Sequence, residues 1–346
     1  MRTIAVCVAL LLASRAAAAQ DRTGVVRGTV VSEQTDEPLP FSIVFIETLG
    51  RERFTDDSGR FVFGELPPGA HRIGVRRLGF QPAHVDMYAR AGSHDTVRVR
   101  MAPIAVRLAD IVVREHPPCT QPGLPAGDAD ATLRTVLSQL MMNAEQYWVL
   151  LRTHPFTYVV RSVTSRKLSK GDSIAIDGAR MFAIDPGQAE AYQPGRIVKR
   201  RGRAYFFRIP GLGDFADSAF IASHCFHYAG LEGLNELDLI RIDVLAAESI
   251  DGADVNGSIY LDPANFQIRR SVLRLSRPLR QVPDVVEMEV ATDYVEAVPS
   301  IPVIGNVASV QKMKPSRRRD YTVGFEHQRL VGIEWKRGQP GENQPR

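Results

Sequence analysis

Residues 54–80, FTDDSGRFVFGELPPGAHRIGVRRLGF, decide the fold that the sequence predicts. Two turn signals, DDSG and ELPPGA, separate short runs in which apolar and polar residues alternate. Alternation with a period of two is the pattern of a half-buried strand, and Phe54, Phe61 and Phe63 would supply its core face. Asp and Gly are the residues that a tight turn favours, so we expect DDSG to close a hairpin.

The same pattern extends outward over residues 24–113. GVVRGTVVS alternates, TDEPLP turns, FSIVFIE has the character of a buried strand, and DTVRVRM and VRLADIVV follow the quoted stretch. About seven short strands with regularly spaced turns predict a seven-stranded β-sandwich.

Beyond this region the composition and the period both change. Residues 114–128 are rich in Pro and Gly and predict a linker. Apolar residues then recur at steps of three and four from Leu133 to Leu151, which predicts a helix that Asp128 or Asp130 caps and THP ends. Core packing is the default use of this stripe, and a ligand-facing aromatic at Tyr147 or Trp148 is the alternative.

Long alternating segments fill most of residues 156–335, with a short helix expected at 212–223. Residues 129–336 therefore predict a helix packed on a curved antiparallel sheet or half-barrel, and the polar tail at 337–346 is expected to be disordered. The fold class as a whole is mainly β.

Residues 1–19 have the organisation of a secretory signal peptide. Arg2 precedes an apolar stretch from Ile4 to Ala13, and small residues end the segment at Ala17–Ala19. An interfacial N-terminal anchor is the alternative, but the stretch has no polar face. We therefore expect export to the periplasm, or to the periplasmic face of the outer membrane, of a Gram-negative-type bacterium.

Charge argues against a nucleic-acid partner, because the net charge of the whole chain is only +4. Two local clusters are more basic, VKRRGR at 198–203 and SRRRD at 316–320. Such clusters are usually solvated strand ends or turns; the functional alternative is contact with anionic lipid or lipopolysaccharide headgroups at the outer-membrane surface.

The cysteines predict one disulfide. Cys7 lies within the predicted signal peptide, which leaves Cys119 and Cys225 in the exported chain. Two cysteines in an oxidising compartment most simply pair with each other, and two buried free thiols are the alternative.

No catalytic, cofactor-binding or metal-ligating set is expected. If DDSG were a calcium loop of the EF-hand type, Phe54 would fill its first ligand position, so a turn is the better interpretation. His224 and His227 are three residues apart, which is a poor zinc spacing on a strand. The motifs H-E-x-x-H, C-x-x-C and G-x-S-x-G are absent, GLGDFA lacks a third glycine, and nothing nominates a glycosidase carboxylate pair.

Two resemblances follow from quoted motifs. The opening VVRGTVV, EPLPFSIV, TDDSGRF and LPPGAHRIGVRRLGF match in order the carboxypeptidase regulatory-like domain, a transthyretin-like β-sandwich, over residues 24–113. That resemblance implies a non-catalytic accessory or binding module. NGSIYLDPANFQIRRSVLRLS at 256–276 is similar to the half-barrel of periplasmic lipoprotein carriers, which implies an apolar cavity for acyl chains.

Three functional hypotheses follow. The first is a non-catalytic envelope protein that binds or scaffolds a peptide, glycan or lipid surface through its regulatory-like domain. The second is a lipid or lipoprotein carrier, and the third is an unrecognised hydrolase. For the carrier, the residues expected to line the cavity are Phe156, Tyr158, Phe206, Ile259, Leu261 and Val285.

Overall fold

The computed structural model describes residues 23–106, 117–125, 131–169, 173–202, 204–234, 237–317 and 319–336. It divides into two compact units, Met1–Pro103 (unit 1) and Ile104–Arg346 (unit 2). The predicted signal peptide, the capping positions Asp128 and Asp130, the strand expected over 107–113 and the tail at 337–346 lie outside the described residues. No helix within those ranges is both long and apolar enough to cross a membrane.

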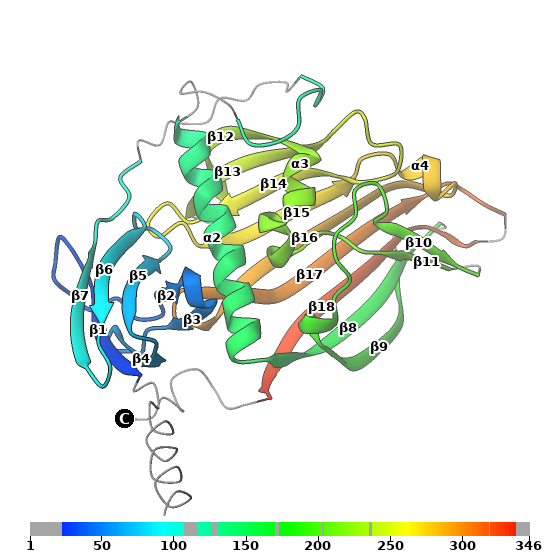
Figure 1. The fold of residues 1–346 in the computed structure, drawn as a ribbon. Coiled ribbons are helices and arrows are strands. Elements are labelled where there is room, and N and C mark those ends of the chain that lie inside the picture. Colours follow the sequence, from blue (N-terminus) through cyan, green and yellow to red (C-terminus); the bar gives the residue numbers. More distant parts are fainter. Residues whose placement is uncertain are drawn as a thin grey trace, which may run out of the picture. The chain divides into compact units, whose positions relative to one another are not determined.

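Unit 1 is a sandwich of two sheets, as the sequence predicts (Figure 1). One sheet has the strand order β4-β1-β7, in which β1 and β7 run parallel; the other has the order β3-β2-β5-β6. Valine, isoleucine and phenylalanine side chains from both sheets, such as Val26, Phe61 and Ile73, form one buried core. The strands are β1 (Gly24–Ser32), β2 (Ile43–Ile46), β3 (Arg51–Phe54), β4 (Arg60–Leu66), β5 (Gly69–Arg76), β6 (Ala83–Ala89) and β7 (His94–Met101), and a 3-10 turn, η2 (Glu47–Leu49), follows β2.

The DDSG segment is a turn, but the expectation that it closes a hairpin is wrong. It joins β3 of one sheet to β4 of the other, so its two flanks do not pair. The Asp56 carboxylate accepts hydrogen bonds from the Ser58 amide at 2.9 Å and the Arg60 amide at 2.8 Å. Gly59 has φ +69°, and a Cβ there would lie 2.6 Å from the Val30 carbonyl oxygen, so only glycine fits.

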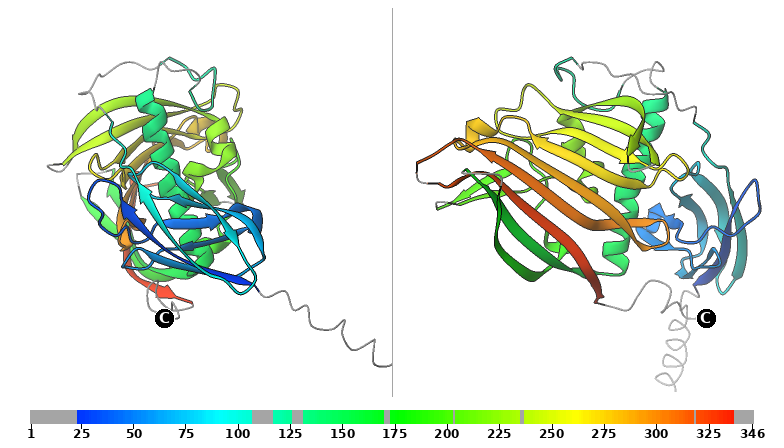
Figure 2. Two further views of the ribbon diagram at one scale, coloured as in Figure 1. Left: turned by 60° about the vertical axis from the view of Figure 1, so that its left-hand side comes forward. Right: turned by 180° about the vertical axis from the view of Figure 1, so that it is seen from behind.

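Unit 2 is built on one open, curved sheet of nine antiparallel strands (Figure 2). Its order is β12-β13-β14-β15-β16-β17-β18-β8-β9, so β8 pairs with β18 although Phe156 and its partner Trp335 are far apart in sequence. The strands are β8 (Phe156–Leu168), β9 (Ile174–Ile184), β12 (His224–Leu234), β13 (Leu237–Ala246), β14 (Val255–Leu261), β15 (Ile268–Leu275), β16 (Val285–Val298), β17 (Ile301–Met313) and β18 (Tyr321–Trp335). A separate two-stranded ribbon consists of β10 (Val198–Arg201) and β11 (Ala204–Phe207).

The predicted long helix is α2 (Ala131–Thr153), which crosses one face of the sheet (Figure 1). Fully buried Asn143 attaches it to the turn between β14 and β15: its side-chain amide donates to the Phe266 carbonyl at 2.9 Å, and its oxygen accepts from the Ile268 amide at 2.9 Å. The helix expected at 212–223 is present as two short turns. The short elements of unit 2 are η4 (Pro186–Gln188), η5 (Leu212–Ala216), α3 (Ser218–Ala222) and α4 (Pro278–Gln281).

The predicted disulfide between Cys119 and Cys225 is confirmed, with a Cα–Cα distance of 5.6 Å, and the alternative of two free thiols is wrong. It ties the Pro-rich segment 117–125 to the beginning of β12. Two backbone hydrogen bonds support this attachment, from Gly123 to the His224 carbonyl and from Glu248 to the Cys119 carbonyl, both at 2.9 Å.

Candidate binding cavity

Unit 2 contains a cavity of about 500 Å³. Helix α2 contributes Tyr147 and Trp148 to its walls, and strands β8, β17 and β18 contribute apolar side chains from the covered face of the sheet. Residues 184–217, which we call the covering segment, close it from the other side. The lining residues of the sheet are Tyr158, Val160, Ile304, Gly305, Val307, Gln328 and Leu330; those of the covering segment are Ile184, Pro186, Ala189, Glu190, Ala191, Arg208, Ile209, Gly211, Leu212, Gly213, Asp214 and Asp217.

An aromatic cluster forms the wall between α2 and β8. The Tyr147 ring lies 6.0 Å from Trp148 and 6.4 Å from Phe156, and Phe156 lies 5.1 Å from Tyr158, all in edge-to-face geometry. The Tyr158 hydroxyl donates to the Tyr147 hydroxyl at 3.4 Å. Burial raises the pKa of Tyr147 to about 12 and also raises that of Tyr158, so both phenols are neutral at physiological pH.

Two charged side chains that line the cavity, Arg208 and Asp214, are paired with each other. Arg208 donates two hydrogen bonds to the Asp214 carboxylate, at 2.7 and 3.0 Å, and a third to the Glu190 carbonyl at 2.7 Å. Asp214 also accepts from the Gly211 amide at 2.8 Å. These contacts hold the covering segment in shape and satisfy its polar groups, which leaves the apolar side chains as the surface that a ligand would meet.

Trp148 fixes the covering segment to the helix. Its indole nitrogen donates to the Gly213 carbonyl at 2.9 Å. A Cβ at Gly213 would lie 2.9 Å from the Trp148 ring, so the close approach requires glycine. The cavity therefore depends on one tryptophan and one glycine that come from different elements.

Ser223, His224 and Asp254 lie together and superficially resemble a hydrolase triad. His224 and Asp254 are completely buried, with Nε2 of His224 3.5 Å from the Asp254 carboxylate. Nδ1 of His224 donates to the Phe220 carbonyl at 2.8 Å, and the Ser223 hydroxyl donates to the Ala219 carbonyl at 2.6 Å. Nδ1 therefore cannot accept a proton from the serine, so this arrangement does not activate a nucleophile.

The same cluster is a structural support for the covering segment. Asp254 accepts from the Tyr192 hydroxyl at 2.6 Å and from the Gly195 amide at 2.7 Å. Burial alone would raise the pKa of Asp254, but the neighbouring His224 imidazole and the hydrogen bonds from Tyr192 and Gly195 outweigh it and lower the pKa. Burial and the neighbouring carboxylate raise the pKa of Tyr192. Residues 192–195 are thus anchored to the beginning of β14.

No site for a metal ion is evident in the part of the chain that the structure describes. Three or more His, Cys, Asp or Glu side chains do not gather at any point there. At DDSG, one oxygen of Asp56 accepts both turn amides, as described above. His224 is enclosed by Phe220, whose ring stacks on it at 4.2 Å.

The six residues predicted to line a cavity separate into three groups. Tyr158 lines it. Phe156, Ile259, Leu261 and Val285 are fully or almost fully buried, but they pack in the core and are not among its lining residues. Phe206 lies on the β10–β11 ribbon with 53% of its surface exposed.

Phe156, Phe206, Ile259, Leu261 and Val285 were thus predicted to line the cavity but do not. The reason is physical. Alternation along a strand identifies which face of a sheet is covered. It does not show where on that face a cavity separates the sheet from the layer that covers it. The lining residues of the covering segment were missed because that segment has no regular period. Tyr147 and Trp148, raised from the sequence as the less common ligand-facing alternative, do line the cavity.

Unit 1 matches a known family, and the whole chain has distant structural neighbours. Residues 25–102 match the model of the carboxypeptidase regulatory-like domain. No curated protein matches the chain. The minor pilin GBS52 of Streptococcus agalactiae is 17% identical, with 27% of this chain and 49% of that chain covered and a TM-score of 0.22. This chain thus spans about half the length of that pilin.

Two other solved structures are matched over most of their length. A putative outer membrane lipoprotein-sorting protein domain from Vibrio parahaemolyticus is 11% identical, with 59% of this chain and 92% of that chain covered and a TM-score of 0.31. A DUF1329 family protein from Desulfovibrio piger is 10% identical, with 60% and 94% covered and a TM-score of 0.32. The resemblance of unit 1 to the carboxypeptidase regulatory-like domain, expected from the sequence, is confirmed over residues 25–102.

Proposed function

We propose that the protein is a non-catalytic, exported envelope protein that holds an apolar ligand, the acyl chain of a lipid or of a lipid-modified protein, in the cavity of unit 2. The observation that carries this proposal is the cavity itself. Its volume of about 500 Å³ lies within the usual range for ligand pockets, and its walls are mostly aromatic and aliphatic. Among the sequence-based hypotheses, this observation favours the carrier.

The paired charges around the cavity support an apolar ligand over a charged one. Arg208 is paired with the Asp214 carboxylate and the Glu190 backbone carbonyl, so an anionic ligand would have to compete with a bidentate ion pair there. Such a pair is costly to open once it is partly buried. A hydrocarbon chain needs none of these groups and gains from the removal of its surface from water.

Export and the role of unit 1 are part of the same proposal. A disulfide is typical of chains that fold in an oxidising compartment, which supports the predicted signal peptide. The family match of unit 1 supports a non-catalytic binding role, such as recognition of a peptide, glycan or lipid surface of the envelope. The hydrolase hypothesis gains no support from Ser223, His224 and Asp254, because all three are buried and engaged.

Two adjacent residues of β18 test the cavity. Leu330 lines it, whereas Val331 is 57% exposed and is not a lining residue. We expect Leu330→Trp to narrow the cavity and to weaken binding of a fluorescent acyl-chain probe by roughly tenfold, which corresponds to about 1.4 kcal/mol. Val331→Trp should bind as the wild type does.

The measurement combines probe titration with mass spectrometry of lipids extracted from protein purified from a bacterial periplasm. The wild type and Val331→Trp should carry acyl-chain lipid, and Leu330→Trp should carry much less. Equal probe affinity in all three proteins, or no bound lipid and no probe binding in the wild type, would contradict the proposal.

A further inference from the structure

The β10–β11 ribbon has an unusual combination of residues for an exposed element. Its strand sequences are VKRR and AYFF, and it belongs to neither of the sheets that form the cores. A two-stranded ribbon in water gains little stability of its own. Phe206 is nevertheless 53% exposed on it.

Among the described residues neither arginine of the ribbon forms an ion pair, although Arg201 lies close enough to Glu190 to help lower the pKa of its carboxyl. Arg200 and Arg201 are exposed, and no carboxylate of the described residues lies within ion-pairing distance of either. Instead each guanidinium lies over an aromatic ring across the ribbon, Arg200 at 5.9 Å from Tyr205 and Arg201 at 5.4 Å from Phe206. By contrast, the neighbouring Lys199 is paired with Glu190.

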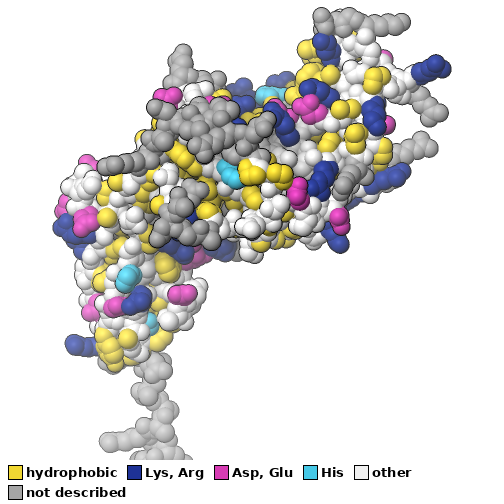
Figure 3. Space-filling view, turned by 90° about the horizontal axis from the view of Figure 1, so that it is seen from above, with side chains coloured by type: hydrophobic (Ala, Val, Ile, Leu, Met, Phe, Trp, Pro, Cys, Tyr) yellow, Lys and Arg dark blue, Asp and Glu magenta, His cyan; other side chains and the backbone are white. Residues whose placement is uncertain are grey.

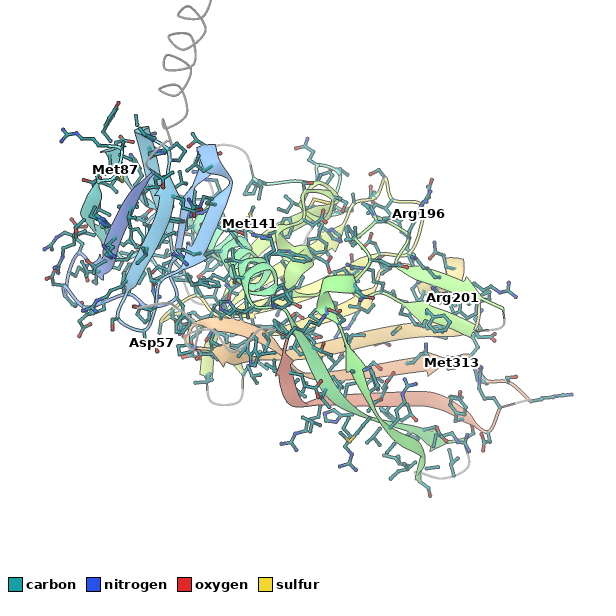
Figure 4. All side chains as sticks on the ribbon, turned by 60° about the horizontal axis from the view of Figure 1, so that its bottom comes forward. Asp57, Met87, Met141, Arg196, Arg201 and Met313 are labelled. Atoms are coloured by element: carbon teal, nitrogen blue, oxygen red, sulfur yellow. A yellow bond between two sulfur atoms is a disulfide. The ribbon has the colours of Figure 1, made fainter. Side chains whose placement is uncertain are left out.

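A second basic element lies at the same end of the long sheet. Figures 1 and 2 show the ribbon and the loop between β17 and β18 at one end of unit 2, and Figure 4 shows Arg201 and Met313, the last residue of β17, at that end. Lys314 and Arg317 of this loop are exposed and, among the described residues, have no carboxylate partner either. In Figure 3, Lys, Arg and hydrophobic side chains lie at the right, with Asp and Glu side chains among them.

We propose that this end of unit 2, the basic–aromatic end formed by Arg200, Arg201, Phe206, Lys314 and Arg317, docks on the surface of an anionic lipid bilayer. Clustered Lys and Arg attract anionic headgroups, and an exposed apolar ring such as that of phenylalanine is buried at the boundary between the headgroups and the acyl chains. Exposed Phe206 favours a bilayer over a polyanion that is held by charge alone, and the net charge of only +4 argues against a nucleic acid. Phosphate attraction alone would make no use of a phenylalanine ring.

The connectivity links this surface to the cavity. The covering segment enters the ribbon after Ala189–Ala191 and leaves it before Arg208–Asp214, and both flanks line the cavity. A protein docked through the ribbon would therefore hold the cover of its cavity against the bilayer. The docking inference stands on the charges and the aromatic residue, so it does not depend on what the cavity holds.

Sedimentation with vesicles tests the inference. The wild type should bind vesicles of phosphatidylcholine with a quarter phosphatidylglycerol, should bind pure phosphatidylcholine weakly, and should be released by high salt. Each basic side chain near an anionic surface contributes about fivefold to binding. The double variant Arg200→Ser/Arg201→Ser should therefore bind roughly thirtyfold more weakly, and Phe206→Ser should also bind less at equal charge.

The control is Arg98→Ser/Arg100→Ser, which removes the same charge from unit 1, where both arginines pair with Asp36. It should bind vesicles as the wild type does, and circular dichroism should show every variant folded.

The inference is overturned if the wild type does not bind anionic vesicles or if both double variants lose binding equally. It is also overturned if Phe206→Ser binds vesicles as the wild type does and the wild type binds duplex DNA as well as it binds anionic vesicles. Affinity for the acyl-chain probe, measured on the same variants, should not change, which separates this result from the cavity proposal.

Discussion

Asp254 is a carboxylate in a position that water does not reach. It is completely buried, yet hydrogen bonds from Tyr192 and Gly195 and the nearby imidazole of His224 keep it ionised. A buried charge is tolerated only when it is paired in this way. Removing one partner should therefore lower the free energy of unfolding by more than the intact pair contributes to it.

We expect Asp254→Asn to destabilise the protein by about 1–3 kcal/mol at pH 7, because the Tyr192 hydroxyl and the Gly195 amide lose their charged acceptor. Acid has a related effect on the wild type. The pKa of Asp254 is lowered on folding, so its contribution is fully present above about pH 4 and is lost as the pH falls through the folded pKa. Urea unfolding between pH 3 and pH 7 measures both effects. A variant with wild-type stability and the same acid dependence would show that the cluster is not a support.

The sequence predicted these residue-scale features unevenly. The pairing of Cys119 with Cys225 was predictable because the only other cysteine of the sequence, Cys7, lies in the predicted signal peptide. The pairing of Asp254 with His224 was not, since no local pattern links residues that meet only after β12 and β14 have folded. Asp56 was correctly placed in a turn, because Asp and Gly carry their turn preference with them.

At the scale of elements, α2 is held on the sheet by Asn143, and Gln146 one turn further along provides a contrast. Both side chains are fully buried. Asn143 is hydrogen-bonded, whereas neither amide atom of Gln146 has a partner in the described part of the chain. The two residues therefore predict opposite effects of the same substitution.

Asn143→Leu should destabilise the protein by about 2–4 kcal/mol, because the Phe266 carbonyl and the Ile268 amide would lose their partner inside the core. Gln146→Leu should leave stability unchanged or increase it, since it removes a polar group that gains nothing from burial. Urea unfolding of both variants at pH 7 is the measurement. Equal destabilisation would mean that the volume of the side chain, and not its hydrogen bonding, controls the attachment of α2.

Elements were predicted well where their period is strong. The period of α2 and the alternation of the long strands of unit 2 identified them from the sequence. The expected hairpin at DDSG failed because alternation shows that two flanks are strands and cannot show whether they pair with each other. The strand β12 was missed because its glycines and histidines, HCFHYAGLEGL, obscure the alternation.

At the scale of the whole molecule, the disulfide belongs to one unit only. Cys119 and Cys225 both lie in unit 2 and close a loop of 106 residues. Reduction should destabilise unit 2 by about 4–5 kcal/mol, the chain-entropy value for such a loop. Unit 1 has its own core and should unfold as before. Calorimetry with and without reductant, with Cys119→Ser/Cys225→Ser as the matched variant, measures this. A parallel shift of every transition would show that the two units unfold together.

The pairing of β8 with β18 determines when unit 2 can fold. Strand β8 has its neighbour on one side only after residues 321–335 have been made, and the cavity needs both strands. Contacts between such distant segments form slowly, because a long loop must close before they stabilise the chain. During synthesis the emerging chain would therefore lack a finished sheet. If the chain is exported as we propose, this delay would keep it open for threading through a membrane pore, and final folding, with the first uptake of the proposed ligand, would follow on the far side.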